Sequence, residues 1–168
     1  RSARKRIENV MRHRQWALAL TGIALVASGA LVATADTSGP ASDVAAWARE
    51  ETPRSTTFIV PPALDSFRVP ARRGVVTTWK AVPFRADLAA DWWTRLTAIA
   101  PLDSPPTGIS GRDLAAAFAR GYLRMSDGDR QRLGETYRAA YAVLPLGAET
   151  ELPVVFEGRR WKAVQLSP

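Results

Sequence analysis

The longest apolar run of the chain lies near its N-terminus, at residues 15–35, and contains no charged residue. A helix rises about 1.5 Å per residue, so a run of this length covers roughly 30 Å, the thickness of the hydrocarbon core of a bilayer. A helix of a soluble protein normally keeps one polar face. The pattern therefore predicts one transmembrane helix. A cleaved signal peptide is the alternative, because a basic segment precedes the run and residues 33–35 resemble a cleavage site.

Small residues recur along one face of this predicted helix, at Gly22, Gly29 and Ala33. Faces of this kind let helix backbones approach closely in lipid, so we expect this one to pack against another span. Trp16 lies at the edge of the run, where an amphipathic ring favours the headgroup zone, and it is a candidate interface residue.

After a linker at residues 36–42, the apolar positions alternate between helical and strand spacing. Helical spacing is found at residues 43–51, 87–100, 111–122 and 129–141. Apolar and β-branched runs predict strands at residues 56–60, 74–80, 141–146, 153–156 and 161–166. Strands separated by helices pair in parallel, whereas the last two predicted strands form an antiparallel hairpin. We therefore expect an α/β fold: a single transmembrane helix, then a small three-layer domain over residues 43–168, with a mixed sheet that ends in the hairpin.

Most of the positive charge precedes the apolar run. Residues 1–14 hold six Arg or Lys side chains and one Glu, and so carry +5 of the formal net charge of +7. This basic arm predicts a cytoplasmic N-terminus and a periplasmic α/β domain at the inner membrane of a bacterial cell. Arg4, Lys5 and Arg6 are candidates for binding anionic lipid headgroups. The remaining charge is nearly balanced, so we expect no nucleic-acid partner.

The residue types that most catalysis requires are scarce in the predicted α/β domain. His13, the only histidine, lies in the arm, and the chain has no cysteine. These facts exclude Ser-His-Asp catalysis and His or Cys metal sites from the domain. Glycine-rich phosphate-binding motifs are also missing from the sequence. We therefore predict a protein that is not an enzyme and uses no cofactor or metal.

Two features of the domain are candidate binding sites. Basic residues lie near the carboxyl ends of its first two predicted strands, at Arg68, Arg72, Arg73 and Lys80. Open α/β sheets bind ligands at that edge, and guanidinium groups suit carboxylates or phosphates, so the set predicts an anion or lipid-headgroup site. The alternative is surface pairing with nearby aspartates. Trp93 is a candidate interface residue, because its ring should point about 100° away from that of Trp92 on a helix.

The domain also carries an ordered string of motifs: Trp47, Thr52-Pro53, Phe58, Pro61-Pro62, Phe67-Arg68, Arg72-Arg73, Lys80, Pro83-Phe84, Trp92 and Arg95-Leu96. With this string, residues 42–166 resemble an uncharacterised family of C-terminal soluble domains from bacterial multi-pass, glycosyltransferase-like membrane proteins. The chain departs from the family pattern at Thr78, where the family has an acidic residue. The resemblance implies a fold and an outer location, and it carries no active site, because the catalytic acid of such enzymes lies in membrane-proximal loops.

Together these features favour a single-pass, membrane-anchored accessory or scaffold subunit of a larger membrane protein complex. A photosynthetic or other electron-transport complex is the expected host. The helix would pack on other spans, and the outer domain would clamp partner subunits, with anionic lipid headgroups at the basic arm. Two alternatives stay open: the C-terminal periplasmic domain of a glycosyltransferase-like membrane enzyme, and an anion-sensing domain.

Overall fold

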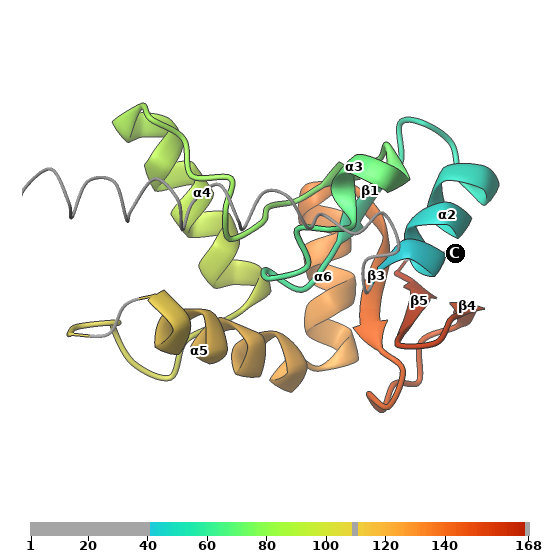
Figure 1. The fold of residues 1–168 in the computed structure, drawn as a ribbon. Coiled ribbons are helices and arrows are strands. Elements are labelled where there is room, and N and C mark those ends of the chain that lie inside the picture. Colours follow the sequence, from blue (N-terminus) through green and yellow to red (C-terminus); the bar gives the residue numbers. More distant parts are fainter. Residues whose placement is uncertain (1–40, 109–110, 167–168) are drawn as a thin grey trace, which may run out of the picture. The chain divides into compact units, whose positions relative to one another are not determined.

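The computed structural model describes residues 41–108 and 111–166, which form five helices and five strands (Figure 1). In chain order these are α2 (Ser42–Glu51), β1 (Thr57–Ile59), α3 (Arg68–Ala71), β2 (Gly74–Val75), α4 (Ala86–Ile99), α5 (Gly111–Arg124), α6 (Asp127–Tyr137), β3 (Ala139–Pro145), β4 (Val154–Glu157) and β5 (Trp161–Gln165).

The five strands form one mixed sheet in the order β2-β1-β3-β5-β4. β1 runs parallel to both β2 and β3, whereas β5 runs antiparallel to β3 and to β4. The chain leaves β1 and returns to its parallel neighbour β3 only after α3, β2, α4, α5 and α6. β2 and β4 are therefore the edge strands of the sheet within the described part of the chain.

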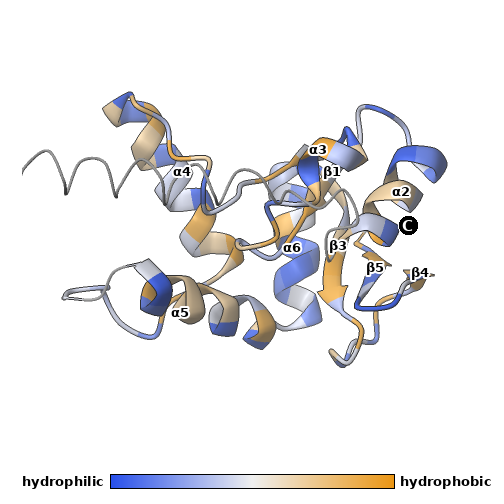
Figure 2. Cartoon of the chain, in the orientation of Figure 1, coloured by the Kyte–Doolittle hydropathy of each residue, from blue (hydrophilic) through white to orange (hydrophobic). Residues whose placement is uncertain are grey.

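Helices cover both faces of this sheet. Successive strand residues point to opposite faces, so they pack alternately into two cores. Phe58 and Val143 belong to a core with α2 and α3, whereas the neighbouring Ile59 and Leu144 belong to a core with α4, α5 and α6. Figure 2 shows the resulting apolar character of β3, the central strand. Burial of β3 from both sides explains its nearly continuous apolar sequence.

Tyr122 joins α5 to the sheet. Its phenol is buried, donates a hydrogen bond to the Val143 carbonyl at 2.7 Å, and lies 3.3 Å from the Ile59 carbonyl. Burial raises the pKa of this phenol well above its ordinary value, so the group stays neutral.

Three elements differ from the sequence prediction. The strand predicted at residues 74–80 ends at Val75, because the chain turns away and the Trp79 N–H donates to the Pro62 carbonyl. The short helix α3 was not predicted. The helix predicted at residues 129–141 begins at Asp127, behind a capping box on Ser126, and ends at Tyr137, because Arg138 adopts a left-handed conformation (φ 51°).

The predicted fold class is wrong in its membrane part. No helix in the described ranges is both long and apolar enough to cross a bilayer. The longest of them, α4 and α5, have 14 residues each, fewer than the about 20 that a span requires. The apolar run at residues 15–35 and the basic arm lie outside the described residues, as do their candidate site residues Arg4, Lys5, Arg6, Trp16, Gly22, Gly29 and Ala33.

Candidate functional site

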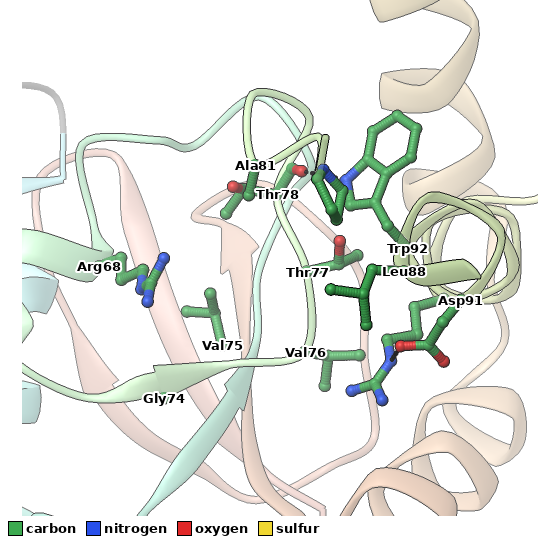
Figure 3. Close-up of a pocket in the computed structure, with 12 residues that line it drawn as sticks. Arg68, Gly74, Val75, Val76, Thr77, Thr78, Ala81, Leu88, Asp91 and Trp92 are labelled. Carbon is green, nitrogen blue, oxygen red and sulfur yellow. Dashed lines mark hydrogen bonds and ion pairs between the residues drawn. The ribbon is translucent and has the colours of Figure 1, made fainter. Parts of the chain in front are cut away.

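A cavity of about 370 Å³ lies beside β2 (Figure 3). We call it the β2 groove and define it by its lining residues: Arg68, Gly74, Val75, Val76, Thr77, Thr78, Ala81, Pro83, Leu88, Asp91, Trp92 and Arg95. They come from α3, from β2 and the segment that leads to α4, and from one side of α4. The volume lies within the range of ligand-binding clefts.

The β2 groove follows the open edge of the sheet. Val75 packs with the α2–α3 core and Val76 with the α4–α6 core, yet both line the groove, so the groove extends around the strand edge. The Gly74 N–H donates a hydrogen bond to the Thr56 carbonyl, just before β1, at 3.2 Å. The Val76 N–H donates to the Phe58 carbonyl of β1 at 3.0 Å. Because these directions alternate along a strand, the Val75 N–H and C=O point away from β1.

Aromatic side chains fix the wall of the groove opposite this edge. The Trp92 Nε1 donates to the Thr78 carbonyl at 2.9 Å, which joins α4 to the segment after β2. The rings of Trp92 and Trp79 lie 6.2 Å apart, and Trp79 in turn packs on Phe118 of α5. These contacts pack the segment against α4 and α5.

The groove contains polar groups that the described chain leaves without partners. Thr77 and Thr78 are each only 6% exposed, and neither hydroxyl makes a hydrogen bond within the described residues. The Arg68 guanidinium likewise has no ion pair there. By contrast, Arg95 is paired with Asp91, one turn before it on α4, at 2.9 Å. Arg68 is therefore the cation of the groove that lacks a carboxylate.

Four exposed, large apolar residues line the groove or are direct sequence neighbours of residues that line it. The Phe84 side chain is fully exposed to solvent, and those of Val82 and Leu88 are about half exposed. Val69, next to Arg68, is also exposed. We call Val69, Val82, Phe84 and Leu88 the apolar rim. They are half of the large apolar residues that the described chain exposes, and such a concentration is typical of an interaction surface.

The four basic residues predicted as one anion site have separate surroundings. Only Arg68 lines the groove. Arg73 is 7% exposed and donates to the Arg49 and Thr52 carbonyls at the end of α2 and to the Thr52 hydroxyl. Lys80 is paired with Asp65 at 3.2 Å. Arg72 is exposed and has a left-handed backbone (φ 52°) at the end of α3.

Trp93 packs on the domain's own core. Its ring meets Phe118 edge-on at 5.7 Å, and it lies 6.0 Å from the ring of Trp92. Both tryptophans contact the same core, contrary to the expectation that they point to different surroundings. The sequence reasoning missed Phe84 as the exposed aromatic residue. Phe84 lies between β2 and α4, outside any periodic apolar pattern, so periodicity gave no signal for it.

A second polar cluster holds the loop between β3 and β4 against α6. The Asp127 carboxylate accepts hydrogen bonds from the Glu151 N–H at 2.7 Å, from the Thr150 hydroxyl at 2.9 Å and from Arg130 at 3.0 Å. Burial acts to raise the pKa of Asp127, but these bonds outweigh it and lower the pKa below its ordinary value. All partners belong to the chain itself, so the cluster is structural. Within residues 41–108 and 111–166, no three acidic, His or Cys side chains gather as a metal site requires.

Comparison with known proteins adds one match. A family model described as a domain of unknown function (DUF6798) matches residues 40–99. No curated protein and no solved structure matches the chain. The matched range runs from α2 through α4, so it contains every residue of the β2 groove and of the apolar rim.

Proposed function

We propose that this chain is a non-catalytic accessory subunit whose α/β domain binds a partner protein at the β2 groove and the apolar rim. The observation that carries the proposal is the full exposure of Phe84 beside a preformed groove. Burying a phenylalanine side chain contributes about 2 kcal/mol, so a partner that covers it gains substantial affinity. Aromatic residues are enriched where protein partners bind most tightly.

The chemistry of the groove favours binding over catalysis. Thr77 and Thr78 have hydroxyl groups, and the described residues that line the groove include no histidine or lysine that would activate them as nucleophiles. Asp91, the groove's carboxylate, is exposed and is paired with Arg95. Protein binding uses the open strand edge, the apolar rim and the groove together.

The proposal is tested by the size of the native assembly that contains the chain, in the cells that make it. We expect the wild-type chain to migrate with a partner, well above its own 18.3 kDa. Replacing two exposed rim residues in the F84S/V82S variant should release the chain to a smaller size. The matched control is L123S, which removes an exposed leucine of α5 outside the groove and should leave the assembly intact. Unchanged migration of F84S/V82S, or wild-type chain that migrates alone, would overturn the proposal.

A further inference from the structure

We infer that the β2 groove takes an extended acidic segment of the partner, which adds as a further strand along the open edge of β2 and places a carboxylate against Arg68. The inference deepens the proposed function and rests on it.

The backbone of β2 provides the first argument. An edge strand presents unpaired N–H and C=O groups, which is how extended peptides add to sheets in many recognition domains. Here Val75 directs its N–H and C=O away from β1, while Gly74 and Val76 are bonded toward it. A segment lying along this edge would exchange hydrogen bonds with Val75. The α4 wall at Leu88 and Trp92 bounds the groove, so the segment would lie between strand and helix (Figure 3).

The two sides of the groove provide the second argument. Successive side chains of an added strand point to opposite faces of the sheet. On the face of Val75 the groove presents Arg68, and on the face of Val76 it presents Leu88 and Trp92. The segment that fits therefore alternates an acidic residue with apolar neighbours.

Charge provides the third argument. Three of the basic residues in or near the groove already have partners. Arg95 forms an ion pair with Asp91, Lys80 forms one with Asp65, and Arg73 donates hydrogen bonds to backbone carbonyls. Arg68 has no such partner within the described residues, and guanidinium groups bind carboxylates in a fork geometry. A carboxylate on the segment would complement the groove, which carries Arg68 and Arg95 against Asp91. A small free anion would satisfy Arg68 alone and leave the strand edge and apolar wall unused.

The side-chain part of the inference is tested by selecting displayed random heptapeptides on the full chain. The wild-type chain should enrich peptides with an acidic residue between two apolar residues. The R68E variant should replace that acidic residue with Lys or Arg at the same position. The matched control is R72E, which reverses an exposed arginine outside the groove and should keep the wild-type preference. Identical selections on wild type and R68E, or no enrichment on the wild type, would overturn the inference.

The backbone part is tested with the selected peptide and two N-methylated forms of it. Methylating the amides that face β2 should weaken binding about tenfold, the loss of one net hydrogen bond. Methylating the alternate amides, which face away, should change affinity less than about threefold. Equal effects of the two forms would exclude strand addition. Both tests differ from the assembly test. Binding at the rim can survive when strand addition fails, and a selected peptide can bind when no native partner does.

Discussion

The indole Nε1 of Trp92 donates a hydrogen bond to the Thr78 carbonyl at 2.9 Å, and this bond joins α4 to the segment that leaves β2. The two elements form opposite sides of the β2 groove, so the distance between these sides depends on the Trp92–Thr78 hydrogen bond. Because β2 itself is only two residues long, its ladder cannot position the segment alone. This single hydrogen bond therefore has a large influence on the shape of the groove.

The W92F variant should lose this bond while keeping an aromatic ring against Trp79. We expect the free energy of unfolding to fall by about 1 kcal/mol, the net value of a hydrogen bond, and the selected peptide to bind more weakly. Urea unfolding and fluorescence anisotropy measure the two effects. The control is W47F, on the other face of the sheet, which should leave peptide affinity unchanged. Full peptide affinity in W92F would show that the bond does not shape the groove.

Arg73 should be essential for stability. Its buried guanidinium donates to the Arg49 and Thr52 carbonyls at the end of α2, and removing it leaves these acceptors unsatisfied. We expect R73M to lower the free energy of unfolding by about 3 kcal/mol, measured by urea denaturation. R72M, at the neighbouring exposed position, should change it by less than about 0.5 kcal/mol. Equal losses in the two variants would contradict this role.

Asp127 should contribute to stability in a pH-dependent way. Its pKa in the folded chain lies below its ordinary value, so its contribution is complete above about pH 4, the pKa of an unfolded aspartate, and is lost as pH falls through the folded value. D127N should therefore reduce stability by about 2 kcal/mol at pH 7 and flatten the decline in acid. Thermal unfolding between pH 2 and 7 measures both effects. A residual slope is expected, because the pKa of Asp129 is also lowered, first by its hydrogen bond with Ser126. An unchanged slope in D127N would exclude the assignment.

Gly121 allows α5 to approach the loop after α4. A Cβ at this position would overlap the Pro101 carbonyl oxygen, so the backbone would have to move. We expect G121A to cost about 3 kcal/mol in urea unfolding. At Gly147 a Cβ would meet nothing within 4 Å, and G147A should be neutral or slightly stabilising. A neutral G121A would show that this packing is looser than described.

Elements with a long, one-sided apolar pattern were predictable. The spacing of Leu88, Trp92, Leu96 and Ile99 predicts a helix at residues 87–100, and α4 lies at Ala86–Ile99. The turn at residues 157–160 likewise predicts the hairpin that β4 and β5 form. In these cases local sequence and tertiary packing favour the same structure.

Other elements depend on contacts that are distant in sequence. The β-branched run after Gly74 continues past Val75, but the Trp79–Pro62 and Trp92–Thr78 hydrogen bonds draw the chain away from β1. The basic residues were predicted as one site because all four lie near the carboxyl ends of the first two predicted strands. In the fold, Arg73 is buried and donates hydrogen bonds to carbonyls at the end of α2, whereas Arg68 lines the groove. Periodicity could not reveal the exposure of Phe84, because no pattern shows which loop residues the rest of the fold leaves uncovered.

The most direct test of the docking surface is photo-crosslinking from position 84 with p-benzoylphenylalanine, in the cells that make the protein. The analogue keeps an exposed aromatic ring at the apolar rim. We predict one discrete protein adduct, which is lost when an excess of the selected peptide competes for the groove, and no such adduct from the same analogue at position 123. Failure to crosslink from position 84, or the same adducts from both positions, would contradict a docking surface at the β2 groove.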